Sequence, residues 1–503
     1  MLSIKTYNYI PVPRIILFVL IFLITFSTHA QLWEEHGALR VSENGHFLEH
    51  EDGTGFFWLG CTAWMLSRLQ PEDVDRYLDS RVEKNFNVIQ FTSTNMGRIN
   101  YQGEQPFLGD EGRPWKTMTP NEAYWKHVDY IVEKAKEKGL YVAIFVWWGT
   151  GANDPNWEEG KDSRMYFRDP DKHNYEFGKF LGERYNDEPH IIWVGAGEYH
   201  KPVSVMFPKN QRPLTETHAR RLTDIIKGIR ESDPEENHLY TIHPISFLSS
   251  SEEFHQADWL DFNMIQSHAV PEFIVPLTLA DWHREPTKPT FNSEGWYENE
   301  HQLYERWTGM KRAKDDPVDP DWKQRYQGYW SVFAGGFGFT YGHKNLWRME
   351  NEEGKAGVLP QHILDAPGSS SLKHLRSLVE SRPIQSRVPD PELVTAGTTG
   401  RDGGLSPDLR IGTRAEDGSW AWIYSTWGSL IRVNMGRLQA GEAQAFWYNP
   451  RSGQWHDGTS DTETKRAFQT GIPSGSDALP QYFDPPGSSG DGNDWVLVLE
   501  VAQ

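Results

Sequence analysis

The sequence predicts an α/β protein: a (β/α)8 TIM barrel followed by a C-terminal all-β sandwich domain. Strand-like and helix-like segments alternate from residue 32 to residue 342. Several of the strand-like segments are apolar throughout, which suits a parallel sheet that is covered on both faces. From about Pro389 the pattern changes to short β-like runs separated by Gly, Asp, Asn and Pro turns. We therefore expect a barrel over residues 31–388 and a β-sandwich over residues 389–503.

Eight βα units, the number in a TIM barrel, follow one another along the chain. The expected strands are residues 55–61, 87–91, 141–147, 191–198, 239–243, 262–266, 290–294 and 338–341. The expected helices are residues 71–84, 119–138, 171–185, 215–230 and 321–334, with one more near 371–379 that closes the barrel. Start signals support the second helix, for which we expect Thr119 as the N-cap, Pro120 as the first helical residue and Glu122 in the capping-box position.

The C-terminal region contains apolar β-like runs at residues 420–425, 443–448 and 495–499, with a turn at 449–453. Several short strands with frequent turn signals are typical of a sandwich.

The first 30 residues are predicted to be a cleaved export signal. Lys5 and Arg14 precede an apolar run over residues 15–24, and Thr28-His29-Ala30 offers a small-residue cleavage site. The run is shorter than the roughly 20 apolar residues that a membrane-spanning helix needs. We expect a secreted or periplasmic protein with no membrane span after signal cleavage.

Composition narrows the classes of partner and chemistry. The formal net charge of -20 disfavours nucleic acid as a partner. Cys61 is the single cysteine, so the chain contains no internal disulfide. The sequence has no HExxH or similar metal motif, no Gly-rich phosphate loop and no GxSxG elbow. We expect neither a metal nor a cofactor.

Two carboxylates carry the expected chemistry, because each follows a predicted strand. Glu198 ends residues 191–198 and Glu294 ends residues 290–294. Barrel enzymes place their catalytic groups at the C-terminal ends of the strands. Glycoside hydrolysis needs one carboxyl to protonate the leaving oxygen and a second to attack the sugar or activate water. We predict Glu198 as the general acid/base and Glu294 as the nucleophile of a retaining reaction.

Further residues near the strand ends are candidates for substrate binding. Sugar rings have apolar C–H faces that pack on indole, and polar side chains fix their orientation. The candidates are Trp64, Gln90, Trp147, Trp148, His243, Gln266, His268, Tyr341, His343 and Trp347.

The sequence resembles the domain-of-unknown-function 4038 proteins, which include the apiosidases of glycoside hydrolase family 140. The resemblance rests on residues 58–64 (Trp-Leu-Gly-Cys-Thr-Ala-Trp), on the Glu198 and Glu294 strands, on Gln266-Ser267-His268 and on residues 340–343 (Thr-Tyr-Gly-His). The C-terminal region resembles the collagen-binding-type domain that follows such barrels, through residues 446–453 and 494–499.

Two positions depart from those relatives. They often carry Asp where this chain has Cys61, and their acid strand often ends Gly-Gly-Asp rather than Gly-Ala-Gly-Glu. Many retaining barrel glycosidases also have Asn before the acid, where this chain has Gly197. A longer acid side chain and a lost first-strand carboxylate would alter the sugar pocket.

The resemblance and the residues together imply a secreted glycoside hydrolase that acts on a complex plant or algal polysaccharide or its oligosaccharides. Short loops after the fourth, sixth and seventh strands favour a pocket and exo action. Two alternatives stay open at this point: an endo-acting polysaccharide hydrolase, and a non-catalytic carbohydrate-binding protein on a barrel scaffold.

Overall fold

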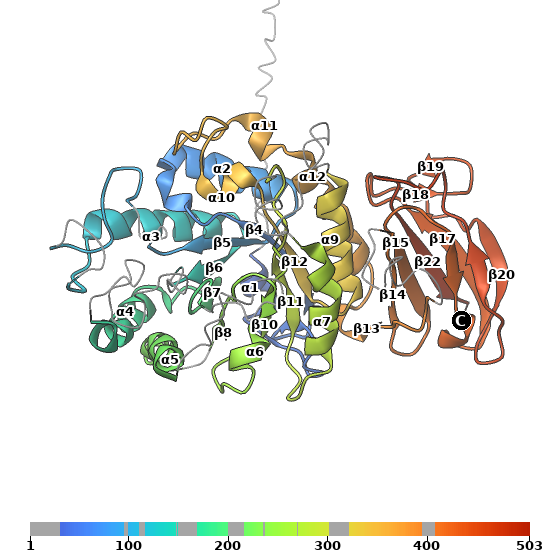
Figure 1. Ribbon diagram of the computed structural model, residues 1–503, viewed down its shortest axis with the longest axis horizontal. Coiled ribbons are helices and arrows are strands. Elements are labelled where there is room, and N and C mark those ends of the chain that lie inside the picture. Colours follow the sequence, from blue (N-terminus) through green and yellow to red (C-terminus); the bar gives the residue numbers. More distant parts are fainter. Residues whose placement is uncertain are drawn as a thin grey trace, which may run out of the picture.

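The computed structural model describes residues 31–94, 99–109, 116–146, 148, 169–199, 216–234, 237–268, 270–300, 321–394 and 408–502. A curled parallel sheet surrounded by helices forms the N-terminal domain, and an antiparallel β domain lies beside it (Figure 1). The parallel strands are β4 (Trp58–Thr62), β5 (Val88–Thr92), β6 (Tyr141–Phe145), β7 (Ile191–Val194), β8 (Leu239–Thr241), β10 (Asn263–Gln266), β11 (Thr290–Glu294) and β12 (Gly338–Tyr341). The predicted barrel class and its eight strands are confirmed.

The sheet closes at one seam without a continuous ladder. Its order is β8-β7-β6-β5-β4-β12-β11-β10-β9, and the short β9 (Leu248–Ser249) pairs antiparallel with β10. Between β8 and the start of β10, the Asp261 N–H donates to the Tyr240 carbonyl at 2.9 Å. The Thr241 hydroxyl donates to the Phe262 carbonyl at 2.6 Å. These bonds join the two ends of the curled sheet.

Helices cover the outer face of the sheet. They are α2 (Pro71–Glu83), α3 (Glu122–Glu137), α4 (Pro170–Tyr185), α5 (Glu216–Arg230), α6 (Ser251–Phe254), α7 (Ile274–Trp282), α9 (Trp322–Phe333), α10 (Lys344–Arg348), α11 (Gln361–Leu364) and α12 (Pro367–Glu380). The start of α3 differs from the sequence-based expectation. Asn121 is the N-cap, since its side chain accepts from the Ala123 N–H, and Pro120 lies before the helix.

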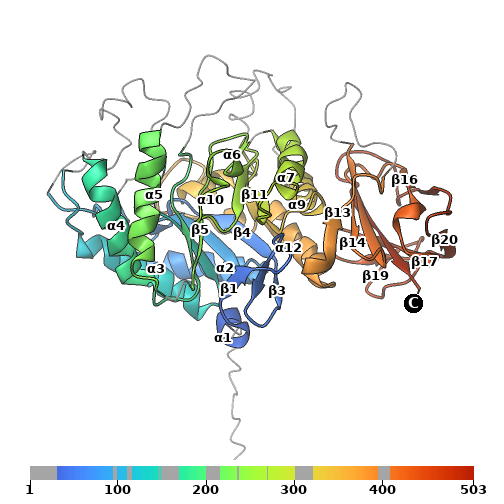
Figure 2. The ribbon, with the colours of Figure 1, turned by 90° about the horizontal axis from the view of Figure 1, so that it is seen from below.

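The N-terminal segment closes one end of the barrel (Figure 2). It comprises α1 (Leu32–His36) and a three-stranded sheet, in which β1 (Leu39–Val41) pairs with β2 (Leu48–His50) and β2 with β3 (Gly55–Phe56). Trp33 packs edge-on against Tyr141 at the start of β6, with ring centroids 5.0 Å apart. Because this end is filled, the opposite end of the strands is the one that can receive a substrate.

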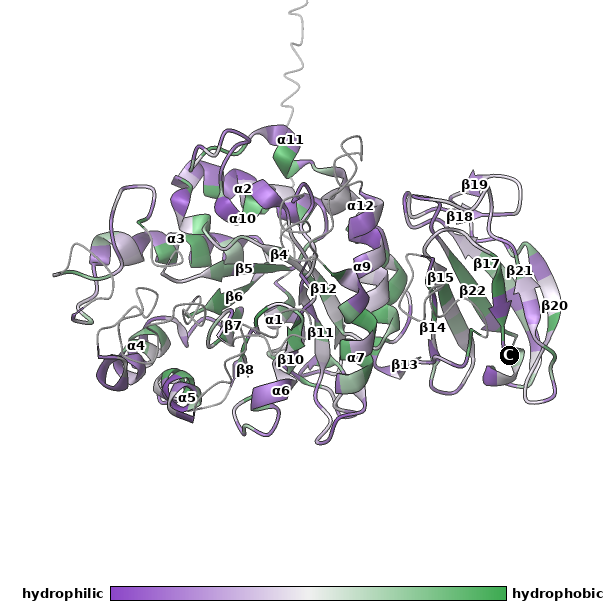
Figure 3. Ribbon diagram, viewed as in Figure 1, coloured by the Kyte–Doolittle hydropathy of each residue, from purple (hydrophilic) through white to green (hydrophobic). Residues whose placement is uncertain are grey.

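The C-terminal domain is antiparallel. Its large sheet contains β13 (Arg387–Pro389), β14 (Arg410–Ala415), β15 (Trp420–Ser425), β22 (Trp495–Val501), β17 (Gly441–Tyr448), β18 (Trp455–His456) and β19 (Asp461–Thr462), with β20 (Gln469–Ser474) also paired to β17. A second sheet pairs β16 (Ile431–Val433) with β21 (Gln481–Phe483). Figure 3 shows hydrophobic residues along β17 and β22.

Both faces of the large sheet are buried, because alternate residues enter different cores. In β15, Trp422 and Tyr424 join the core shared with the barrel, whereas Ala421 and Ile423 join the core inside the β domain. The same alternation occurs in β17 and β22. This two-faced burial explains why these strands are continuously apolar in the sequence.

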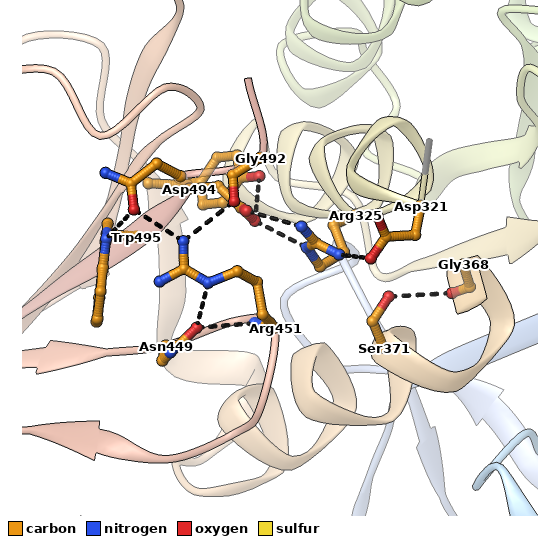
Figure 4. A network of polar contacts seen from close by, with 11 residues as sticks. Asp321, Arg325, Gly368, Ser371, Asn449, Arg451, Gly492, Asp494 and Trp495 are labelled. Carbon is orange, nitrogen blue, oxygen red and sulfur yellow. Dashed lines mark hydrogen bonds and ion pairs between the residues drawn. The ribbon is translucent and has the colours of Figure 1, made fainter. Parts of the chain in front are cut away.

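A buried ion pair fixes the interface between the two domains (Figure 4). Arg325 of α9 binds both carboxylate oxygens of Asp494, each at 3.0 Å, and these side chains are 2% and 1% exposed. Asp321 also bonds Arg325, and the Tyr424 hydroxyl donates to Asp494 at 3.0 Å. Tyr329 stacks on Tyr424 with ring centroids 4.5 Å apart. The domains therefore share one packed and hydrogen-bonded contact.

Candidate active site

A β-bulge directs Glu294 into the barrel. Met264 pairs with Phe291 and Ile265 with Asn292, but Gln266 pairs with Glu294, so Ser293 is an extra residue in β11. Side chains alternate across a regular strand, so Asn292 and Glu294 would normally point to the same, outward face. The bulge at Ser293 breaks this alternation. The bulge places Glu294 on the same face as Gln266.

Glu294 lies in a buried cluster of hydrogen-bonding groups and is 3% exposed. The Tyr297 hydroxyl donates to Glu294 Oε1, and Trp64 Nε1 donates to the Tyr297 oxygen at 2.7 Å. On the other side, His243 Nε2 lies 3.3 Å from Glu294 Oε2. Burial lowers the pKa of His243 to about 3, so this imidazole is neutral at ordinary pH. Tyr297 therefore positions the carboxylate, and His243 borders it without adding a positive charge.

Glu198 is held in an unusual backbone conformation four residues after β7. Its φ is +47°, in the left-handed region that non-glycine residues rarely adopt, and His268 has the same φ beside Glu294. Gln266 Nε2 donates to Glu198 Oε1 at 3.4 Å. Such strain persists where the surrounding structure fixes it, and it concentrates at functional sites.

The two carboxylates are close enough to affect each other's charge. Burial raises the pKa of Glu294 well above its ordinary value of 4.5, and the negative charge of Glu198 raises it further. Hydrogen bonds from Tyr297 and Gln266 act in the opposite direction. Two such groups titrate as a pair, and we infer that the pair retains one proton near neutral pH.

Aromatic rings surround the carboxylates. Trp64 packs against Trp148 with ring centroids 4.5 Å apart, and His243 lies 6.0 Å from Trp148. Trp347 lies 6.4 Å from Tyr297, and its buried Nε1 has no partner among the described residues. Trp148 and Trp347 are partly exposed, so both can contact a ligand.

Two more of the predicted residues lie near the pair. His268 donates its N–H to the Glu294 carbonyl at 3.2 Å. Gln90 is in register with Thr62 and shares the inward face of β4 and β5. Its amide nitrogen and oxygen are buried without a partner in the described structure. Trp147 lies outside the described residues.

Two predicted pocket residues make their contacts elsewhere. Tyr341 pairs with Cys61 on the outward face of the sheet, and its hydroxyl donates to Glu298 at 2.6 Å. His343 caps α10 through Nδ1, and its Nε2 lies 3.0 Å from Asn299 Nδ2. The structure does not bring either side chain to the carboxylates.

Cys61 also faces outward, toward Arg81 of α2, whose Nη1 lies 3.8 Å from the sulfur. The exchange of Asp for Cys at this position therefore changes the layer between β4 and α2 rather than the sugar pocket.

Sequence reasoning missed Tyr297. The residue follows Glu294 by three positions, and its role depends on the turn that returns its ring toward Trp64. The available signal was a Tyr shortly after a strand-end carboxylate, which is too common to be specific.

No group of three or more His, Cys, Asp or Glu side chains that could hold a metal ion occurs in the described ranges. Within the same ranges, no helix is long and apolar enough to cross a membrane.

The family model described as "Apiosidase-like, catalytic domain" matches residues 42–386. The chain belongs to the apiosidase-like family. A second model, described as "Putative collagen-binding domain of a collagenase", matches residues 388–500. Both matches confirm the resemblance that the motifs indicated. No curated protein sequence matched the chain.

Solved structures support the same assignment for this apiosidase-like chain. A glycoside hydrolase family 5 protein from Bacteroides vulgatus ATCC 8482 is 27% identical with a TM-score of 0.74, and the match covers 93% of this chain and 94% of that one. A structure titled "Glycoside hydrolase" is also 27% identical, with a TM-score of 0.72 and coverage of 93% and 98%. The chain is an enzyme of the glycoside hydrolase type.

Proposed function

We propose that the protein is a secreted, retaining, exo-acting glycoside hydrolase that removes sugar units from a complex plant or algal polysaccharide or its oligosaccharides. The observation that carries the proposal is the mutual placement of Glu198 and Glu294, with Gln266 between them and an inferred single proton for the pair. The export signal predicted from residues 1–30 supports the proposal of secretion.

In the first step, Glu294 attacks the anomeric carbon while Glu198 gives its proton to the leaving oxygen. In the second step, Glu198 takes a proton from water, and that water releases the sugar from Glu294. The hydrogen bond from Tyr297 favours the charged form of Glu294 and opposes the burial that raises its pKa. The reaction starts from the form of the pair in which Glu198 holds the proton. Neutral His243 lies 3.3 Å from Oε2 and adds no positive charge that would weaken the nucleophile.

The reaction class is tested by comparing the wild type with Glu294→Gln on a panel of plant and algal oligosaccharides, including apiose-bearing pectic fragments. We expect released sugar from the wild type and at least a 10³-fold lower rate in the variant, about 4 kcal/mol in transition-state stabilisation. An NMR spectrum of the first product, taken before mutarotation, should show the anomeric configuration of the substrate.

The matched control is Asp281→Asn. Asp281 is a buried carboxylate whose pKa is also raised by burial, and it accepts a hydrogen bond from Thr290 at the other end of β11. This variant should lose stability and keep its hydrolysis rate. An inverted first product would reject retention, and equal loss in both variants would reject Glu294 as the nucleophile.

The mode of attack is tested on a long polysaccharide. Exo action should release small sugars while the mean chain length stays nearly constant. A rapid fall in viscosity would instead support the endo-acting alternative.

A further inference from the structure

Gly197, immediately before Glu198, lies against the indole of Trp148. A Cβ atom at position 197 would lie 2.5 Å from Cε3 and 2.6 Å from Cζ3 of Trp148. Real side chains do not approach a ring carbon this closely, so any larger residue would displace the indole. The two residues also form an isolated parallel bridge, which fixes their backbones side by side.

Backbone conformation does not explain the glycine. Gly197 is absent from the glycines with a positive φ, whereas Glu198 next to it has a φ of +47°. A residue with a side chain could therefore adopt the backbone of position 197. The main conflict is with the volume that Trp148 occupies, since the next nearest atom, Cδ1 of Phe145, would lie 3.2 Å from the added Cβ.

Trp148 is in the right place to contact a sugar. Its ring centroid lies 4.5 Å from that of Trp64, 5.9 Å from that of Phe145 and 6.0 Å from that of His243, so three rings pack around it. It remains partly exposed, and His243 contacts Glu294 at 3.3 Å. The indole thus borders the same space as both carboxylates.

We propose that Trp148 is the stacking platform for the sugar unit held between Glu198 and Glu294. Gly197 leaves the space that the indole of Trp148 occupies. The ligand class is a glycosyl unit with an apolar C–H face that packs on indole. Position 197 then offers no polar side chain to a sugar hydroxyl, so selection on this side of the ring is by shape. The inference rests on the proposed hydrolase and deepens it by assigning its specificity to this pair.

The test is a double-mutant cycle with Gly197→Ala, Trp148→Ala and their combination, read as kcat/KM on the oligosaccharide that the wild type cleaves best. Trp148→Ala should lose on the order of 30-fold, as for a buried aromatic contact at an interface, and Trp148→Phe should recover most of that loss. Gly197→Ala should cost about 10-fold or more alone but less than about 2-fold in the Trp148→Ala background, because its main steric conflict has gone.

Binding separates this inference from the proposed reaction. In the Glu294→Gln background, calorimetry with apiose-bearing pectic, xylo- and laminari-oligosaccharides should show binding that Trp148→Ala weakens by a similar factor, whether or not the wild type hydrolyses them. Gly412→Ala is the control for a general cost of added volume, since its Cβ would lie 2.8 Å from Leu393 in the β domain. That variant should change the melting temperature only.

Three results would overturn the proposal. They are an unchanged kcat/KM in Trp148→Ala, an equal cost of Gly197→Ala with and without the indole, and no binding of any of these oligosaccharides. If the wild type hydrolyses none of the substrates but binding still depends on Trp148, the proposed function is overturned. The role of Trp148 as a stacking platform would then remain.

Discussion

Carboxylates are buried both at the barrel mouth, where Glu198 and Glu294 lie, and at the interface between the domains. Their charges are compensated to different extents in the two places. At the interface, Asp494 faces the guanidinium of Arg325 and accepts a further bond from Tyr424. At the mouth, Glu294 faces another carboxylate, and its Oε2 lacks a hydrogen bond within the described structure. Full compensation gives stability, whereas incomplete compensation leaves groups ready to bind and exchange protons with a substrate.

The two regions also differ in backbone strain. Positive φ values occur at Glu198 and His268 beside the mouth, whereas Arg325 lies within a regular helix, α9. Two tyrosines make the comparison testable, because each donates to a buried carboxylate: Tyr297 to Glu294 and Tyr424 to Asp494.

The largest effect on stability is expected from breaking the interface pair. Arg325→Met leaves Asp494 buried without its cation, which typically costs about 3–5 kcal/mol. Urea unfolding should show this loss, while the double variant Arg325→Met/Asp494→Leu should recover much of it. A loss as large in the double variant would mean that packing, rather than charge, holds the interface.

The next effect is expected at the mouth. Tyr297→Phe removes a donor to an ionised carboxylate, worth about 1.5–3 kcal/mol, so kcat/KM should fall roughly 10- to 100-fold. Because that bond lowers the pKa of Glu294, its loss should shift the acidic limb of the pH–rate profile to higher pH. An unshifted profile would contradict the role given to Tyr297.

A smaller effect concerns stability against pH. The pKa of Glu294 is raised in the folded state, so its contribution is greatest below about 4.5 and is lost as pH rises toward the folded value. Glu294→Gln should therefore be stabilised relative to the wild type at pH 7 but not at pH 4, by about 1.4 kcal/mol for each pKa unit of the shift. Thermal unfolding of both proteins at pH 4 and pH 7 measures this difference.

The smallest effect on stability is expected from the second tyrosine, Tyr424. Tyr424→Phe removes one donor from Asp494 while the bidentate Arg325 contact remains. We expect about 1 kcal/mol of lost stability by urea unfolding, with kcat/KM unchanged. A fall in activity to match Tyr297→Phe would show that the two regions are coupled.

Much of the architecture could be predicted from the sequence, because strand patterns and turn signals are local. All eight barrel strands and the antiparallel domain follow from apolar runs and their spacing. The predicted start of α3 was wrong because both Thr119 and Asn121 could serve as the N-cap. Only the hydrogen bond from Ala123 distinguishes them.

The site could be predicted only in outline. Strand ends identified Glu198 and Glu294, but the outward direction of Tyr341 depends on its register with Cys61. The inward direction of Glu294 depends on the bulge at Ser293, and alternation alone would have placed it on the other face. The pairing of Arg325 with Asp494 joins residues 169 positions apart, which no local pattern reveals.

Because the large antiparallel sheet is buried on both faces, the protein cannot be truncated between its two domains without exposing apolar surface. A fragment that ends before β14 would expose the aromatic surface of α9, and a fragment that begins there would expose Trp422 and Tyr424 to water. Each fragment would then have an exposed hydrophobic surface that promotes aggregation. We therefore expect the two parts to be stable only as one unit. A C-terminal module taken from a relative has to fit the face of α9, which is a barrel helix between β11 and β12.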